Sequence, residues 1–287
     1  MHVYLGIDAG GTHTRARLVS SDGTLLGTGE SGPGNTSAGL DLALEAVEEA
    51  AGEAVRAAGI GESAAIHAGI GIAGLNRRGT LAGLQEHAFR FASVRFASDA
   101  AIANLGAHAG GDGAIVVVGT GSIGFGRVGG KVITIGGYGF PVSDEGSGAE
   151  LGLRAVRRAL WARDGRIAAT PMTDAILEIF HRSTGEIVDW TSAARPADYA
   201  QFAPMVMDHA EQGDGVAEMM VQESALRLGR VVRVMLDRAP RVCLMGGLAP
   251  RMREWLAVSI RSRLVEPLGD SLDGAILLAK QGEEEGA

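Results

Sequence analysis

An acidic residue followed by glycines and hydroxyls stands close to the amino terminus. A strand-like apolar run leads into this group, whose polar and flexible members are Asp8, Gly10, Gly11, Thr12 and Thr14. Glycine lets a backbone approach an oxyanion closely, and amide and hydroxyl groups donate hydrogen bonds to it. An aspartate beside such a turn would face a divalent cation, commonly through water because Mg²⁺ dehydrates reluctantly. A phosphate-binding turn with a metal-orienting acid fits this pattern, and so does an ordinary hairpin turn.

A second stretch repeats this plan later in the chain. A buried strand runs into Gly119, Thr120 and Gly121, and Ser122 follows. Two strand-like segments come after each turn, at 15–20 and 24–29 after the first, and at 123–128 and 131–135 after the second. The repeat favours a duplicated domain whose two copies face one nucleotide across a cleft.

A further acid, Asp99, follows the strand expected at 93–98 and precedes a helix expected at 100–109. An acid at the carboxyl end of a strand in an α/β sheet stands where ligands bind. Aspartate also commonly caps the helix that follows it, so position alone leaves both interpretations of Asp99 open.

Two loops carry further candidates for ligand binding. Asn35 lies in a glycine-rich and proline-containing loop before a long helix, where it is either a ligand-binding amide or an ordinary turn residue. The densest motif spans 136–148 and contains Tyr138, Gly139 and Asp144. An acidic helix start, stabilised by the helix dipole, would explain the charge of this motif but not its glycine and aromatic residues.

The expected elements alternate between strands and helices. Besides the strands above, the chain predicts strands at 64–73 and 241–245, and helices from about residue 40 to a stop at Gly59 and at 80–91, 149–163, 170–182, 197–211, 214–238, 250–264 and 273–280. The strand at 241–245 ends in Gly246 and Gly247. This alternation predicts an α/β protein.

Composition bounds the class of protein. The 287 residues fit two domains of ordinary size or one large one, and 44 glycines with 46% hydrophobic and 21% charged residues describe a compact, turn-rich chain. A net charge of −8 without a basic block argues against binding to nucleic acid or an anionic membrane. The single cysteine, Cys243, rules out an intrachain disulfide and favours a cytoplasmic location.

The two turns and the 136–148 motif carry a resemblance to a known family. The chain resembles the sugar kinase, Hsp70 and actin superfamily and, within it, the BadF/BadG/BcrA/BcrD ATPase family, which includes N-acetylglucosamine and glucosamine kinases. The resemblance runs nearly end to end. It implies two duplicated ribonuclease H-like domains flanking a nucleotide cleft, with 1–109 plus 272–287 in the first domain and 110–271 in the second.

The resemblance also implies a role for each candidate residue. Asp99 would be the base that takes the proton from a sugar hydroxyl, and Asn35 would hydrogen-bond the sugar. Asp144 matches the sugar-contacting acid of a Gly-Asp-Glu-Gly-Ser element, although Ser143 replaces the usual glycine. The two turns would hold the phosphates of ATP, with Asp8 orienting Mg²⁺. The glycine pair Gly246 and Gly247 would lie against the adenosine.

The expected reaction is MgATP-dependent phosphorylation of the 6-hydroxyl of an amino sugar. Tyr138 and Gly139 could wall the acetyl methyl group of N-acetylglucosamine, which is the favoured substrate. Asp144 or Glu145 could instead face the ammonium of glucosamine, which is the alternative. A second alternative is a nucleotide or sugar sensor that keeps the fold without catalysis. A homodimer is expected.

Overall fold

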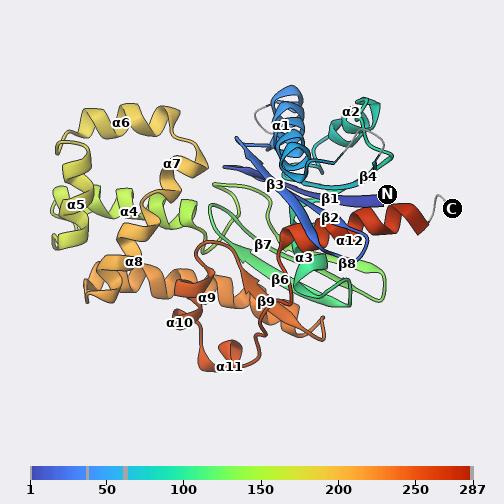
Figure 1. Ribbon diagram of the computed structural model, residues 1–287. Coiled ribbons are helices and arrows are strands. Elements are labelled where there is room, and N and C mark those ends of the chain that lie inside the picture. The colour runs from blue at the N-terminus through green and yellow to red at the C-terminus, as the bar shows by residue number, and fades with distance from the viewer. Residues whose placement is uncertain (1, 37–38, 61–63, 285–287) are drawn as a thin grey trace. The chain divides into compact units, whose positions relative to one another are not determined.

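The computed structural model describes residues 2–36, 39–60 and 64–284 (Figure 1). The chain forms two compact units. The first unit contains Met1–Gly113 together with Glu266–Ala287, and the second unit contains Ala114–Val265. Each unit is built on its own sheet, and the two are described in turn.

The first unit has a five-stranded mixed sheet in the order β3-β2-β1-β4-β5. Its strands are β1 (His2–Ala9), β2 (Thr14–Ser20), β3 (Leu25–Ser31), β4 (Ala65–Ile72) and β5 (Ser93–Ser98). Strands β1, β2 and β3 pair antiparallel, whereas β4 runs parallel to both β1 and β5. The carboxyl ends of β1, β4 and β5 therefore meet at one edge, which is where ligands bind in sheets of this kind.

Helices cover both faces of this sheet. They are α1 (Leu40–Ala58), α2 (Thr80–Glu86), α3 (Asp99–Ala107) and α12 (Ser271–Glu284). Along β1, Val3, Leu5 and Ile7 join the core under α1, while Tyr4 points the other way and packs against Ile276 of α12. Figure 1 shows α1 and α12 on opposite sides of these strands. Because side chains alternate along a strand, Asp8 belongs to the same face as Tyr4, the face of α12.

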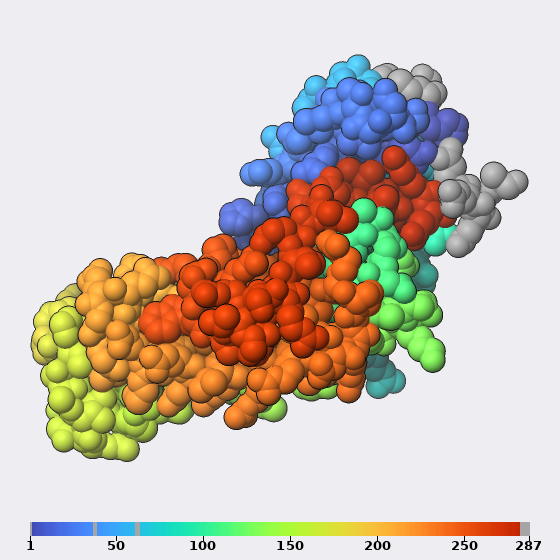
Figure 2. Space-filling view, turned by 90° about the horizontal axis from the view of Figure 1, so that it is seen from below, coloured from blue at the N-terminus to red at the C-terminus, as the bar shows by residue number. Residues whose placement is uncertain are grey.

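The last helix completes the first unit although it comes from the end of the chain. In Figure 2 the red α12 lies between the blue amino-terminal strands and the green segment that contains α3. Glycines allow the close approach of α12 to α3, because a Cβ atom at Gly106 would lie 1.8 Å from the Asp270 carbonyl oxygen. A Cβ at Gly274 would likewise lie 1.8 Å from the Ile102 carbonyl oxygen. Arg17 of β2 adds ion pairs of 2.7 Å to both Asp270 and Asp273.

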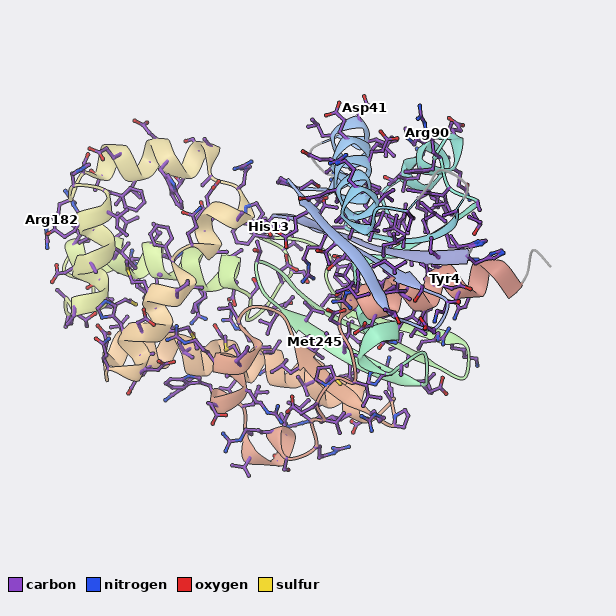
Figure 3. All side chains as sticks on the ribbon, in the orientation of Figure 1. Tyr4, His13, Asp41, Arg90, Arg182 and Met245 are labelled. Carbon is purple, nitrogen blue, oxygen red and sulfur yellow. The ribbon has the colours of Figure 1, made fainter. Side chains whose placement is uncertain are left out.

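The second unit has a four-stranded sheet in the order β8-β7-β6-β9. Its strands are β6 (Gly113–Val118), β7 (Ser122–Val128), β8 (Lys131–Gly136) and β9 (Val242–Met245). Strand β9 is parallel to β6, and β8 is antiparallel to β7. The carboxyl ends of β6 and β9 are therefore neighbours, and Figure 3 labels Met245 at the end of β9.

Helices make up most of the second unit. They are α4 (Gly148–Arg163), α5 (Pro171–Ile179), α6 (Thr184–Ala193), α7 (Pro196–Ala200), α8 (Ala203–Glu211), α9 (Gly215–Leu236), α10 (Ala249–Trp255) and α11 (Val258–Arg261). One continuous core joins them to the strands, with Leu151 of α4 and Leu228 of α9 fully buried in it. None of the described helices is long and apolar enough to cross a lipid bilayer.

Several helices differ from the sequence expectation. Helix α6 was not predicted, because Ile187 is its one buried residue and it therefore has no apolar stripe. The helix expected at 197–211 is two helices, since Pro204 lacks an N–H group and belongs in the first turn of α8. The helix expected at 250–264 also breaks, because Leu256 and Ala257 are extended between α10 and α11. The helix expected at 80–91 ends at Glu86.

Candidate active site

The first glycine turn joins β1 to β2 at the edge where the parallel strands end. The Gly10 N–H donates to the His13 carbonyl at 3.0 Å, which closes the turn, and the Gly34 N–H donates to the Gly10 carbonyl at 3.0 Å. Gly11, Thr12 and His13 are exposed, and Figure 3 labels His13 on this turn. Exposed amide and hydroxyl donors on a short turn can bind an oxyanion.

Thr14 lies differently from the rest of the turn. Its side chain is fully buried, and its hydroxyl donates to the Gly32 carbonyl at 2.9 Å. It is the first residue of β2 and pairs with Ala9. In this arrangement Thr14 holds the loop of residues 32–34 against the turn.

Three charged side chains gather on the α12 face at this edge. Asp8 is the last residue but one of β1 and forms a 2.8 Å ion pair with Arg15, which lies directly across from it on β2. Asp99 begins α3 directly after β5, and the Asp8 carboxylate is close enough to act on it electrostatically. The structure thus brings the predicted metal-orienting acid and the predicted base together in one unit.

The protein around Asp99 stabilises the protonated form of its carboxyl relative to an aspartate in water. The surrounding protein raises the pKa of the Asp99 carboxyl by desolvation, and the neighbouring Asp8 carboxylate raises it further by repulsion. The side chain still reaches solvent. Ser98, and not Asp99, is the cap of α3, because the Ser98 hydroxyl accepts from the Ala101 N–H at 3.1 Å. Asp99 accepts from the Ala100 N–H at 2.9 Å.

Asn35 lies between the glycine turn and the end of β4. A Cβ atom at Gly11 would be 3.9 Å from the Asn35 amide nitrogen, and a Cβ at Gly74 would be 3.2 Å from its amide oxygen. The next residue fixes the loop, since the Thr36 N–H donates to the Ala73 carbonyl at 3.2 Å. The Asn35 amide is therefore held at the same edge of the sheet as the turn.

The second unit brings its two glycine motifs together. Gly246 directly follows β9 and has a φ of 101°. It packs against the end of β6, because a Cβ atom at Gly246 would lie 2.3 Å from the Val118 carbonyl oxygen. A Cβ at Gly119 would lie 3.9 Å from the Gly247 nitrogen. The turn that begins at Gly119 and the pair Gly246 and Gly247 thus form one backbone-lined surface at the ends of two parallel strands.

Helix α4 begins against this surface. The Gly148 N–H donates to the Gly119 carbonyl at 2.7 Å, and the Ala149 N–H donates to the Thr120 carbonyl at 3.1 Å. Ser147 caps the helix, its hydroxyl accepting from the Glu150 N–H at 3.2 Å. The positive end of the α4 dipole therefore points at the turn of residues 119–122, which favours an anionic ligand there.

Asp144 packs directly on the second turn. Its carboxylate accepts from the Ser122 N–H at 3.3 Å, and a Cβ at Gly121 would be 3.2 Å from one of its oxygens. Burial raises the pKa of the Asp144 carboxyl, and the neighbouring Glu145 charge adds to this. Asp144 also has a φ of 69°, a left-handed conformation that few residues other than glycine adopt. A strained, buried acid of this kind commonly marks a functional site.

The aromatic residues beside Asp144 point in different directions. Tyr138 is 81% exposed, whereas Phe140 packs against Tyr199 with ring centres 5.3 Å apart. Gly139 has a φ of 95°, and its carbonyl accepts from the Ser143 N–H at 2.8 Å. Tyr138 and Gly139 thus form the exposed tip of this loop.

The Asp8 carboxylate has the chemistry needed to bind a hydrated magnesium ion. The described residues hold no group of three or more histidines, cysteines or carboxylates arranged to bind a metal. Mg²⁺ on a nucleotide needs only one or two carboxylates, because phosphates and water supply its other ligands. Asp8, half-buried at the end of β1, fits that requirement.

Sequence reasoning missed two sets of charged residues. The sequence places Arg15 within an expected strand and does not reveal that its guanidinium pairs with Asp8. The antiparallel register, in which Asp8 lies opposite Arg15, explains the pair. The sequence places Glu150 within an expected helix and does not reveal that its carboxylate accepts from the Gly146 N–H at 2.8 Å. Its partner Arg227 comes from α9, so no local pattern reveals that pair, whereas its partner Arg154 lies one turn further along α4.

Two named kinases are similar to nearly the whole chain. It is 36% identical over 286 residues to glucosamine kinase GspK of Vibrio cholerae, covering 99% of this chain and 97% of that protein. It is 27% identical over 304 residues to the N-acetylmuramic acid/N-acetylglucosamine kinase of Clostridium acetobutylicum, covering 98% of this chain and 99% of that protein. Both relatives are named as kinases of amino sugars.

A solved structure has the same fold. The proposed N-acetylglucosamine kinase from Chromobacterium violaceum superposes with a TM-score of 0.90 at 36% identity, covering 96% of this chain and 98% of that one. The sequence model of the BadF/BadG/BcrA/BcrD ATPase family matches residues 5–279. The expected fold class, a two-domain α/β ATPase of the sugar kinase type, is therefore confirmed. The chain belongs to the BadF/BadG/BcrA/BcrD ATPase family.

Proposed function

We propose that this protein is an ATP-dependent kinase that phosphorylates the 6-hydroxyl of an amino sugar, with N-acetylglucosamine as the substrate predicted from the sequence. The observation that carries the proposal is the arrangement of Asp99 and Asp8 on one face of the first unit. Asp99 lies at the start of α3 and is the proposed proton acceptor, and Asp8 lies beside the first glycine turn.

Each residue has a defined part in the proposed reaction. Asp99 accepts the proton of the attacking sugar hydroxyl, and Asn35 orients the sugar through its amide. The turns at 10–13 and 119–122 donate to phosphate oxygens, and the start of α4 adds its dipole. Mg²⁺, when bound through Asp8, neutralises phosphate charge. Phosphoryl transfer depends mainly on such positioning and charge stabilisation.

Glucosamine is the second candidate, for two reasons. The Vibrio cholerae relative, which matches over nearly the full length of both chains, is named as a glucosamine kinase. In addition, the exposed Glu145 carboxylate lies next to the buried Asp144, and within the part of the chain that the structure describes it accepts one side-chain hydrogen bond, from the Ser143 hydroxyl at 3.3 Å. Such a carboxylate suits an ammonium group, which N-acetylglucosamine lacks.

A coupled assay of ADP release with each sugar tests the proposal. The ratio of the two kcat/KM values decides between the substrates, because specificity is that ratio. A 6-deoxy analogue should bind without releasing ADP, which tests the position of transfer. Turnover of the 6-deoxy analogue would contradict transfer to the 6-hydroxyl. Absence of ADP release with either amino sugar would favour a non-catalytic sensor.

A further inference from the structure

A network of four charged side chains joins α4 to α9, close to the loop of residues 144–147 that packs on the second glycine turn. Arg154 of α4 is buried, and its Nη1 donates to the Ser224 hydroxyl at 3.0 Å and to the Met220 carbonyl at 3.3 Å. Its Nη2 pairs with Glu223. Glu150 of α4 pairs with Arg227 of α9 and lies 3.9 Å from Arg154. The network contains two acids and two arginines and is neutral as a whole.

The network also holds a backbone group of the 144–147 loop. One oxygen of Glu150 pairs with Arg227, while the other accepts from the Gly146 N–H at 2.8 Å. Gly146 has a φ of 78° and presses on α9, because a Cβ there would lie 2.8 Å from the Ser224 carbonyl oxygen. The loop is therefore fixed to α9 by close packing and by the carboxylate that Arg227 holds.

The same loop carries the groups proposed to act on ligands. Asp144 lies two residues before Gly146 and accepts from the Ser122 N–H. The Ser122 hydroxyl donates to the Glu145 carbonyl at 2.9 Å. A displacement of Gly146 would thus move the Asp144 carboxylate and the turn of residues 119–122 together, since covalent and hydrogen bonds link all three.

We propose that Arg227 is a positioning residue of the active site, which acts by holding Glu150 in the orientation that fixes Gly146 and thereby Asp144. This inference rests on the proposed function, because it takes Asp144 to contact the sugar. Misplacing a binding group by a fraction of an ångström weakens ligand contacts even when the fold is intact.

Arg227 is the arginine of the network whose replacement we expect to leave the fold intact. Its side chain is 42% exposed, so its removal leaves Glu150 able to recruit water. Removing the buried Arg154 would instead strand Glu150 and Glu223, and the loss of one partner from a buried ion pair is strongly destabilising. The informative variants are therefore Arg227→Met, which keeps length without charge, and Arg227→Lys, which keeps the charge.

Helix α9 supplies a matched control. Arg230 lies one turn further along α9 and is exposed, and its side chain forms no hydrogen bond or ion pair with any residue that the structure describes. Arg230→Met removes the same charge and the same donors from the same helix, but it does not touch Glu150. Any effect of net charge or helix propensity will appear in both variants.

Two measurements on the full chain test the inference. Hydrogen exchange at the amides of residues 144–148 should be faster in Arg227→Met by about tenfold or more, and unchanged in Arg230→Met. The KM for the amino sugar should rise by about tenfold in Arg227→Met with kcat within about threefold, and Arg227→Lys should recover most of the loss.

The possible outcomes separate this inference from the proposed function. Unchanged exchange in Arg227→Met would overturn the positioning role. A fall in kcat at constant KM, together with a lower melting temperature, would mean that Arg227 serves stability alone and would also overturn it. If the wild-type protein phosphorylates no amino sugar, the proposed function fails, while the exchange measurement still decides whether Arg227 positions the loop.

Discussion

The proposed role of Asp99 as a base requires an ionised carboxyl, and the surroundings of Asp99 oppose that ionisation. Desolvation raises the pKa of Asp99, and the Asp8 carboxylate raises it further. A raised pKa makes the carboxylate a stronger base, and proton transfer is most effective when the pKa of the base lies near the working pH. The same shift means that acid will protonate Asp99 at a higher pH than it would an ordinary aspartate.

Replacement of Asp99 by Asn should lower kcat by roughly 10²–10⁴-fold, because asparagine cannot accept the proton. The Ser98 cap of α3 remains, so the circular dichroism spectrum should not change. In the wild type, kcat/KM should fall as the pH drops through the raised pKa of Asp99. Turnover near the wild-type level in Asp99→Asn would remove Asp99 from the mechanism.

Asp144 should lower stability at neutral pH, because burial raises the pKa of its carboxyl above the ordinary 3.8. The folded protein then holds this proton more tightly than the unfolded chain. Protonated Asp144 therefore stabilises the folded protein. This stabilisation is fully present below the pKa that Asp144 has in the unfolded chain, and it is lost as the pH rises through the pKa that Asp144 has in the folded protein. Asparagine carries no charge at any pH, accepts the same Ser122 hydrogen bond and tolerates a positive φ.

The variant Asp144→Asn should therefore melt at a higher temperature than the wild type at pH 7.5, and this gain should shrink towards pH 4.5. Melting curves at both pH values measure it, with Glu49→Gln, which removes an exposed carboxylate from α1, as the control for the loss of one charge. A gain that is equal at both pH values would show that the charge is not the cause.

At the scale of elements, the crossing of α3 and α12 depends on two glycines. Gly106 and Gly274 each face the backbone of the opposite helix at a distance that excludes a methyl group. A helical glycine normally weakens a helix by roughly 1 kcal/mol relative to alanine. Here close packing outweighs that cost, since α12 contacts β1 and β4 as well as α3.

Gly274→Ala should therefore destabilise the protein by about 1–3 kcal/mol, the usual effect of overpacking, despite the better helix propensity of alanine. Gly52 in the middle of α1 is the matched control, because a Cβ there would meet only the flexible end of Arg56, at 3.2 Å. Gly52→Ala should be neutral or stabilising. Chemical denaturation measures both, and equal effects would contradict the packing argument.

Local sequence was enough to predict the elements in which an apolar run meets a glycine turn. Strands β1 and β6 are continuous, mostly buried apolar runs, and each stops beside glycines that suit a turn. Helix α6 has no apolar stripe to reveal it. The break at Leu256 is set by tertiary packing, because Leu256 and Ile260 both lie beside Gly229 of α9.

Some residues of the candidate site could be predicted from local sequence, and others could not. Asp8, Asp99 and Asp144 could be named because each lies within a recognisable local pattern. The Arg15 pair with Asp8 follows from strand register, which the sequence alone does not fix. The pairing of Glu150 with Arg227 joins residues 77 positions apart, and such a contact leaves no trace in local periodicity.

At the scale of the whole molecule, the two units differ in continuity. The second unit is one uninterrupted segment, and its core is built from residues of that segment alone. The first unit is assembled from both ends of the chain, because α12 covers the face of β1 that carries Tyr4. Burial of that face therefore requires the last helix.

Residues 114–265 expressed alone should fold cooperatively, whereas residues 1–113 alone should not. Joining residues 1–113 to 266–284 through a flexible linker should restore folding, because α12 then returns to the sheet. Circular dichroism and thermal melting of the three polypeptides test this. Cooperative melting of residues 1–113 without α12 would show that the helix is dispensable.

The position of α12 in the chain also sets an order of events during synthesis on the ribosome. The strands that carry Asp8 emerge first, yet the helix that covers them is translated last. At about 5–20 residues per second, synthesis of the intervening second unit takes roughly 8–30 seconds. Throughout that interval the face of β1 that carries Tyr4 lacks its covering helix. The first unit, which holds the proposed base Asp99, is thus the last part of the nascent protein to mature.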